Sequence, residues 1–110
     1  MRYCLALDMP ADPALIAEYE EWHRKVWPEI KQSIFDSGID SMDIYRIENR
    51  LIMFLATGPD FSFERKAAMD DANPIVQKWE SMMSKYQVVI PGGKPGVKWR
   101  VAENIFSLNK

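Results

Sequence analysis

The sequence contains one histidine, His23, and it lies among aromatic side chains. Tyr19 precedes it by four residues and Trp27 follows it by four, so on a helix all three side chains leave from one face. Imidazole has an ordinary pKa of about 6.5, so it can accept and donate protons near neutral pH, and a neighbouring phenol can orient a hydroxyl group. The spacing therefore predicts an acid/base site with His23 as the proton-transfer residue.

The same spacing also fits a purely structural explanation. Apolar and aromatic residues that repeat at helical intervals are typical of an amphipathic helix packed against a core. On that interpretation His23 is a core histidine with a satisfied hydrogen bond. The positions in the repeat are Leu15, Tyr19, His23, Val26, Ile30 and Ile34. Spacing alone leaves both explanations open.

Length and composition indicate a small globular protein. A chain of 110 residues, 47% of them hydrophobic, is enough for a single domain over residues 1–110 with one core. The net charge of −2 provides no basic surface for a nucleic acid or an anionic membrane, so we expect a small-molecule partner.

Cys4 is the single cysteine, and no segment approaches the roughly 18 apolar residues of a membrane span. A cytoplasmic protein is expected, because the first residues also lack the apolar run of a signal peptide.

The first half of the chain predicts a strand, a long helix and a hairpin. Alternating apolar residues indicate a strand over 2–9. Asp12 and Pro13 begin a helix that Pro28 interrupts near residues 24–27 and that Gly38 ends. The hairpin is expected to pair residues 42–47 with 51–57 through a tight turn, with Asn49 at positive φ.

The second half predicts two helices, a loop and a final strand. The loop at 91–96, rich in proline and glycine, is interpreted as mobile and able to cover a pocket. Apolar alternation then indicates a strand that is interrupted by a bulge and resumes. The expected ranges are helices over 61–69 and 74–86, a strand from 97 to 101, a bulge at 102–104 and a continuation over 105–108.

The element order β-α-β-β-α-β predicts an α+β, ferredoxin-like fold, with an antiparallel sheet and its helices on one face. The strand at residues 51–56 is apolar on both faces, so both faces of the sheet must be covered. We therefore expect a twofold homodimer in which a second copy covers the bare face, sheet on sheet.

Other kinds of chemistry find little support in the sequence. One histidine and one cysteine leave only carboxylates as further metal ligands, and no spaced set of carboxylates is present, so no metal is expected. Asp70 and Asp71 are interpreted as a solvated helix end. The loop at 91–96 lacks the following helix and the lysine-serine pair of a phosphate-binding loop. No cofactor is expected.

A motif that spans most of the chain resembles the L-rhamnose mutarotase family, including its relatives that act on L-fucose. The motif is Tyr19-x-x-x-His23-x-x-x-Trp27-Pro28-Glu29, followed by Gly38, Ile44-Tyr45 and Trp79. The resemblance implies a dimeric α/β-barrel type of fold and an isomerase that interconverts the α and β anomers of a 6-deoxy-L-hexose. It also implies that His23 is the proton donor and that Tyr19 contacts the sugar.

This sequence departs from the rhamnose enzymes at two positions. Met42 stands where they have a tyrosine, and Trp79-Glu80 stands where they have two tryptophans. The resemblance therefore gives Tyr19, Met42, Trp79 and Glu80 as the substrate-binding residues. Trp79 can stack on a sugar, and Glu80 adds a hydroxyl acceptor that should alter which epimer fits. Met42 and Trp79 also fit simple core packing.

The Trp79-Glu80 pair and the later Lys94-Pro95-Gly96-x-x-Trp99 segment look more like the fucose-associated branch. Two alternatives remain: a dimeric ferredoxin-like module that binds a small ligand, and a cofactor-free oxygenase with a flat aromatic substrate. Polarity distinguishes them, because an oxygenase pocket should be almost wholly apolar. Convergence of Tyr19, His23 and Glu80 on one place would favour a polyol substrate.

Overall fold

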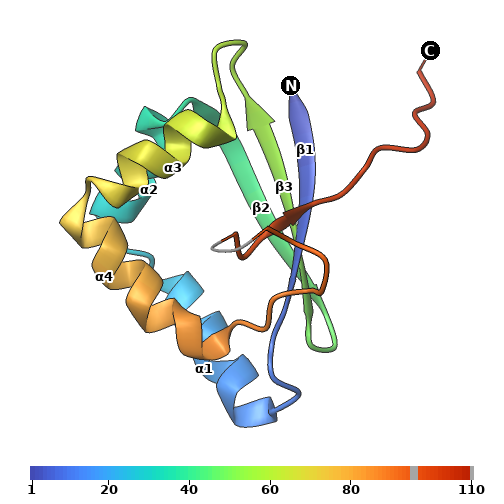
Figure 1. The fold of residues 1–110 in the computed structure, drawn as a ribbon. Coiled ribbons are helices and arrows are strands. Elements are labelled where there is room, and N and C mark those ends of the chain that lie inside the picture. The colour runs from blue at the N-terminus through green and yellow to red at the C-terminus, as the bar shows by residue number, and fades with distance from the viewer. Residues whose placement is uncertain (95–96, 110) are drawn as a thin grey trace.

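The structure is a computed structural model that describes residues 1–94 and 97–109 (Figure 1). Its strands form one antiparallel sheet in the order β2-β3-β1-β4. All helices lie on one side of this sheet, which confirms the expected α+β, ferredoxin-like fold (Figure 1). The elements are β1 (Arg2–Asp8), α1 (Pro13–Arg24), α2 (Pro28–Asp36), β2 (Ile39–Ile47), β3 (Arg50–Thr57), α3 (Phe63–Asp71), α4 (Pro74–Met83), the 3-10 helix η1 (Ser84–Tyr86) and β4 (Arg100–Val101).

The long helix is divided in two at Pro28, as expected. Asp12 caps α1, because its carboxylate accepts hydrogen bonds from the backbone N–H groups of Ala14 and Leu15. Trp27 has extended backbone angles and Pro28 begins α2, since proline cannot donate to the preceding turn. The break places His23 in the last turn of α1, where the backbone of the next residues leaves the helix axis.

The hairpin forms as expected, although its turn differs in detail. β2 begins at Ile39, three residues earlier than predicted, directly after Gly38 ends α2 at a φ of 97°. The prediction of positive φ at Asn49 was wrong, because Glu48 has that conformation, at φ 51°. Asn49 instead holds the end of β1: its side-chain amide donates to the carbonyl of Met9 over 3.0 Å, and its own carbonyl accepts from the Met9 N–H over 2.7 Å.

The two later helices are confirmed with shifted ends. Ser62 caps α3 through a hydrogen bond from the Arg65 N–H, and Asn73 caps α4 through bonds from Ile75 and Val76. The expected helix to residue 86 is α4 followed by η1. Residues 91–94 of the expected loop have no helix or strand, and residues 95 and 96 lie outside the described part of the chain.

The last expected strand is much shorter than predicted. Of the strand expected over 97–108, only the two residues of β4 pair with β1. The last backbone hydrogen bond from this segment to the sheet runs from the Ala102 N–H to the carbonyl of Cys4. Because Leu5 lies opposite Val101, Ile105 would be level with Met1, where β1 has no more residues to pair. The continuation over 105–108 is therefore wrong within one chain, and Figure 1 shows this segment leaving the body of the protein.

The core consists of two clusters between the sheet and the helices. The aromatic cluster contains Met9, Tyr19, Ile30, Leu51, Val76, Trp79, Met83 and Tyr86. The strand cluster contains Leu5, Ile39, Met53, Leu55 and Phe61. Three half-buried side chains, Ile34, Ile44 and Trp99, pack against both clusters. The helical layer and the sheet thus share one continuous interior.

The opposite face of the sheet carries exposed apolar side chains. By strand register, Cys4, Phe54 and Tyr45 lie on this face, and the last two are 48% and 60% exposed. In β3, the exposed Phe54 alternates with the buried Leu51, Met53 and Leu55. This strand therefore has apolar residues on both sides, as expected. Within the described residues, no helix is long and apolar enough to cross a membrane.

Candidate active site

His23 is held in one orientation by its own helix. Its Nδ1 lies 2.8 Å from the backbone carbonyl oxygen of Tyr19. A carbonyl can only accept a hydrogen bond, so Nδ1 must carry the proton and donate it. In the neutral ring this leaves Nε2 as an unprotonated acceptor. The last turn of α1 therefore presents a half-buried imidazole whose free nitrogen can take up a proton.

Aromatic rings from α1, α4 and the α1–α2 break surround the imidazole. The Tyr19 ring stacks on His23 with centroids 4.2 Å apart, and the Trp79 ring meets His23 edge-on at 5.9 Å. Trp22 and Trp27 also contact Trp79 edge-on, at 6.2 and 5.1 Å. These contacts fix three of the predicted site residues, Tyr19, His23 and Trp79, in one place.

The surroundings keep both proton-carrying rings uncharged. Burial lowers the pKa of His23 below its usual value of 6.5, and the hydrogen bond with the Tyr19 carbonyl opposes this effect in part. Burial raises the pKa of Tyr19 far above its usual range, and the negative charge of Glu80 raises it further. At neutral pH the site therefore contains a neutral imidazole, which is a base, and a neutral phenol, which is a hydrogen-bond donor.

Glu80 lies close enough to this group to act on it electrostatically. Its carboxyl group is half-buried, and burial raises its pKa. The positive charges of Lys98 and Lys66 oppose that rise, whereas the negative charge of Asp70 adds to it. Glu80 follows Trp79 directly on α4, so the helix that brings Trp79 to His23 also carries Glu80.

Met42 stands apart from the other four predicted residues. It is half-buried on the helix-facing side of β2, opposite Leu55. There it packs against the strand cluster, while Tyr19 and Trp79 belong to the aromatic cluster. Ile44 and Trp99 lie between, since each contacts both clusters. The structure thus brings together Tyr19, His23 and Trp79, carries Glu80 next to Trp79 on α4, and leaves Met42 with the strand cluster.

Sequence reasoning missed Tyr86, a buried residue that packs against Tyr19. It is 1% exposed, meets the Tyr19 ring edge-on at 5.7 Å, and donates its hydroxyl hydrogen to Glu18 Oε1 over 2.9 Å. Tyr19 therefore contacts both His23 and Tyr86. Tyr86 was predicted only as the end of the helix over 74–86, and its partner Glu18 lies 68 residues away, so no local pattern could reveal the pair.

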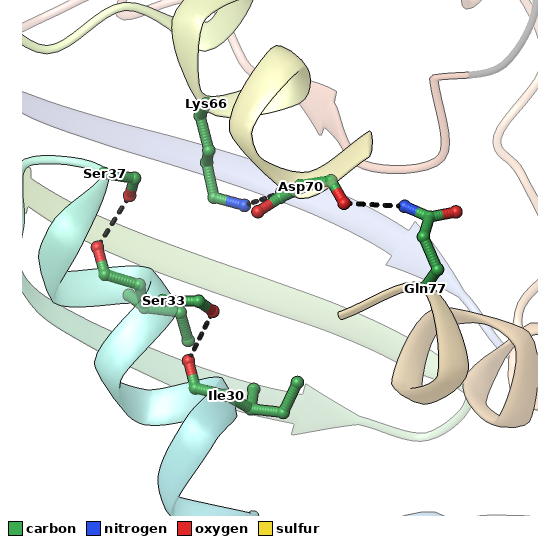
Figure 2. A network of polar contacts seen from close by, with 7 residues as sticks. Ile30, Ser33, Ser37, Lys66, Asp70 and Gln77 are labelled. Carbon is green, nitrogen blue, oxygen red and sulfur yellow. Dashed lines mark hydrogen bonds and ion pairs between the residues drawn. The ribbon is translucent and has the colours of Figure 1, made fainter. Parts of the chain in front are cut away.

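Asp70 was also misjudged, because it is not a solvated helix end. Its carboxylate accepts a hydrogen bond from Lys66 Nζ at 2.5 Å, and the two side chains are 19% and 25% exposed. Figure 2 shows this ion pair on α3, with the Asp70 backbone carbonyl joined to the Gln77 side chain of α4. The i, i+4 spacing of Lys66 and Asp70 was the sequence signal for this pair.

The site is distinct from a large hollow on the protein surface. That hollow has a volume of about 620 Å³ and lies between α1 and the β2–β3 turn, where Glu20 and Arg46 form an ion pair. Tyr19, His23, Trp79 and Glu80 do not line it. In residues 1–94 and 97–109, no three histidine, cysteine, aspartate or glutamate side chains are grouped so that they could hold a metal ion.

The lowered pKa of His23 predicts a specific pH dependence. In the folded protein the imidazole should titrate below pH 6.5, whereas in the unfolded chain it should titrate near about 6.5. Its contribution to the free energy of unfolding is therefore present above pH 6.5 and is lost as the pH falls through the folded-state pKa. NMR of the ring protons can follow this single histidine directly, and His23→Gln should remove this part of the pH dependence. A folded-state midpoint at or above 6.5 would contradict the burial argument.

Comparisons with known proteins identify the family of this chain. A family model described as L-rhamnose mutarotase matches residues 2–108. An L-fucose mutarotase from Xanthomonas campestris pv. campestris is 44% identical over 111 residues, which cover 99% of this chain and 89% of that protein. An L-rhamnose mutarotase from Phocaeicola vulgatus is 33% identical over 90 residues, which cover 82% of this chain and 85% of that protein. The crystal structure of an L-rhamnose mutarotase from Formosa agariphila shares the fold, with a TM-score of 0.71, 24% identity and 99% coverage of both chains. The chain therefore belongs to the L-rhamnose mutarotase family.

Proposed function

We propose that this protein is a mutarotase that interconverts the α and β anomers of a 6-deoxy-L-hexose, with L-fucose preferred to L-rhamnose. One observation carries the proposal: the Nδ1 of His23 is committed to the Tyr19 carbonyl, so a basic Nε2 remains beside a neutral phenol. The family and the 44% identity to an L-fucose mutarotase support the same substrate class.

In the proposed reaction, His23 is the catalytic residue. Its Nε2 takes the proton of the anomeric hydroxyl, the C1–O5 bond breaks as C1=O1 forms, and the imidazolium delivers that proton to O5. The resulting aldehyde rotates about C1–C2. In ring closure Nε2 takes the proton back from O5 as O5 adds to the other face of C1, and the imidazolium then protonates O1. Such acid/base assistance supplies about 10²–10⁴-fold, which suits a reaction that already proceeds in water.

The substrate contacts follow from the side chains around His23. The Tyr19 hydroxyl can donate to a sugar oxygen because its proton is strongly retained. Trp79 offers an aromatic surface to the C–H face of the ring, and the Glu80 carboxylate can accept from one or two hydroxyl groups. Met42 would contact the methyl group or another apolar part of the sugar from β2.

The polar groups favour this function over the two alternatives. A flat aromatic substrate would suit apolar walls, whereas an imidazole, a phenol and a carboxylate converge here. A binding module without chemistry would not require a basic nitrogen held in one tautomer. Trp99 packs against the aromatic cluster and the charge of Lys98 acts on Glu80, and we infer that these two residues border the entrance for the sugar.

We also propose that the protein works as a cytoplasmic homodimer. The single cysteine, Cys4, is unpaired, which suits a reducing compartment. Exposed apolar residues on the outer face of the sheet and in the C-terminal segment indicate that a partner covers them. In that segment Ile105, Phe106 and Leu108 are 90%, 76% and 82% exposed. A second copy of the chain can bury both surfaces at once.

Replacement of the catalytic histidine should abolish most of the activity. His23→Ala is expected to lower the rate of anomer exchange by at least about 10²-fold, because it removes proton transfer. Saturation-transfer NMR on the anomeric protons of L-fucose measures this rate. Arg24→Ala is the matched control, since Arg24 is the neighbouring, exposed residue and forms an ion pair with Glu21. Unchanged exchange in the His23→Ala protein would rule out its assigned role.

Substrate preference should depend on Glu80. The wild-type protein is expected to exchange L-fucose faster than L-rhamnose and to act poorly on D-glucose, because a buried hydroxyl without a partner costs about 1–3 kcal/mol. Glu80→Gln or Glu80→Trp should narrow or reverse the preference between the first two sugars. The same NMR experiment on all three sugars provides the test. A clear rhamnose preference in the wild-type protein would refute this assignment of Glu80.

A charge on the outer face of the sheet should separate the two copies. Phe54→Lys is expected to convert the dimer to a monomer in analytical ultracentrifugation at micromolar concentration, because it places a charge in the proposed interface. Phe35→Lys is the matched control: Phe35 is 60% exposed but lies on α2, in the helical layer. A wild-type protein that sediments as a monomer would exclude the homodimer.

A further inference from the structure

Within the described residues, Trp99 is the one aromatic ring that reaches the aromatic cluster from the sheet. It is half-buried, directly precedes β4 and packs against both the aromatic cluster and the strand cluster. The other aromatic rings in or against the aromatic cluster lie on α1, α4, η1 or the break between α1 and α2. A half-buried indole in this place retains a surface that a ligand could contact, and its N–H can donate a hydrogen bond.

The pairing of β4 directs the next residue, Arg100, away from this interior. Val101 lies opposite Leu5, which is buried on the helix-facing side of β1, and Arg100 lies opposite Ala6. Side chains alternate along a strand, so the Arg100 side chain leaves on the side of the sheet that faces away from the helices. Trp99 packs inward, so these two neighbouring residues serve opposite sides of the sheet.

Arg100 fastens the segment that begins at Pro91. Its Nη1 donates to the backbone carbonyl of Pro91 over 2.6 Å. A Cβ atom at Gly92, where φ is 93°, would lie 3.3 Å from this nitrogen, and one at Gly93 would lie 3.4 Å from Arg100 Cδ. Both glycines therefore lie directly against the Arg100 side chain, and Gly92 also has a backbone conformation that other residues rarely adopt.

This contact closes the base of an excursion of the chain. Val88 pairs with Asp8, and Arg100 pairs with Ala6 on the same edge of β1. The chain between Val88 and Arg100 therefore leaves that edge and returns to it two residues away. Because β4 has only two paired residues, its ladder provides little hold, and the hydrogen bond from Arg100 to Pro91 joins the two ends of the excursion.

We propose that Trp99 contacts the sugar, and that Arg100 is a positioning residue that holds the indole against the aromatic cluster. The sugar contact rests on the proposed function, whereas the effect of Arg100 on Trp99 does not. In this arrangement the helices supply His23 and Trp79, and the sheet side supplies a second indole face for the C–H groups of the ring. Loss of the Arg100 contact lets β4 separate from β1, so the indole no longer has a fixed place.

The first measurement needs no sugar. NMR of ¹⁵N-labelled protein follows the indole N–H signals, and Trp99→Phe assigns the signal of Trp99. The same sample gives the hydrogen-exchange rate of the Ala102 amide, which donates to the Cys4 carbonyl over 2.7 Å. Arg100→Met should shift the Trp99 signal toward its position in an unfolded chain and speed Ala102 exchange by at least about tenfold. Gly92→Ala should act in the same direction, because its methyl group would press against Arg100.

Arg2→Met is the matched control for Arg100→Met. It removes the same charge from an exposed position on β1, and by alternation with Ala6 it lies on the same side of the sheet as Arg100. Equal changes of the Trp99 signal and of Ala102 exchange in the two variants would overturn the positioning role.

The second measurement is the dependence of the anomer-exchange rate on the concentration of L-fucose, which separates KM from kcat. Trp99→Leu and Arg100→Met should raise KM about tenfold and leave kcat within about twofold, because they remove a binding surface and leave His23 in place. Trp99→Phe keeps a ring and should retain most of the affinity. An unchanged KM in the Trp99→Leu protein would overturn the sugar contact, and so would equal losses in the leucine and phenylalanine variants.

Direct binding distinguishes failure of this inference from failure of the proposed function. Addition of L-fucose to the wild-type protein should shift the Trp99 indole signal. If the wild-type protein exchanges the anomers while this signal stays in place, the sugar contact is wrong and the proposed function stands. Absence of exchange with both L-fucose and L-rhamnose would refute the proposed function and the sugar contact together, whereas the first measurement would still decide the role of Arg100.

Discussion

The hydrogen bond between the His23 ring and the Tyr19 carbonyl is the interaction on which the site depends. It requires an intact final turn of α1, because the two residues must stand one turn apart. It also requires that the next segment leave the helix, so that Nε2 is not covered by a following turn. Pro28 meets the second requirement, since it cannot continue the α1 hydrogen-bond pattern and begins α2 in a new direction.

Packing around Tyr19 then makes that local geometry rigid. The ring stacks on His23 and meets Tyr86 edge-on, and Tyr86 is itself held by a hydrogen bond to Glu18. Trp79 contacts His23, Trp22 and Trp27, so α4 closes over both ends of the break between the first two helices. The site therefore consists of side chains on helices, supported by rings that have little freedom to change rotamer.

The parts of this arrangement that could be predicted are those with a local cause. Helix starts at Asp12 and Asn73, the interruption at Pro28 and the left-handed Gly38 each follow from the chemistry of one residue and its neighbours. The Tyr19–His23 pair follows from helical spacing. Sequence reasoning failed at Asn49 and Tyr86, because their partners Met9 and Glu18 are 40 and 68 residues away in the chain. At Asp70 the signal was local and was overlooked, since Lys66 precedes it by four residues. Ile105 and Phe106 show strand-like character, but the neighbouring strand ends before it reaches them.

In the proposed reaction Glu80 would have a second role beyond sugar recognition, because the charge on His23 changes during the reaction. His23 and Tyr19 are both neutral at rest, which limits the unfavourable effect of burying them. When Nε2 takes the anomeric proton, a cation forms in a half-buried place, and burial alone disfavours it. In this proposed reaction an ionised Glu80 would stabilise that cation, whereas a tryptophan at this position could do so only through the weaker field of its ring. Glu80 would thus affect both which sugar binds and how readily His23 accepts its proton.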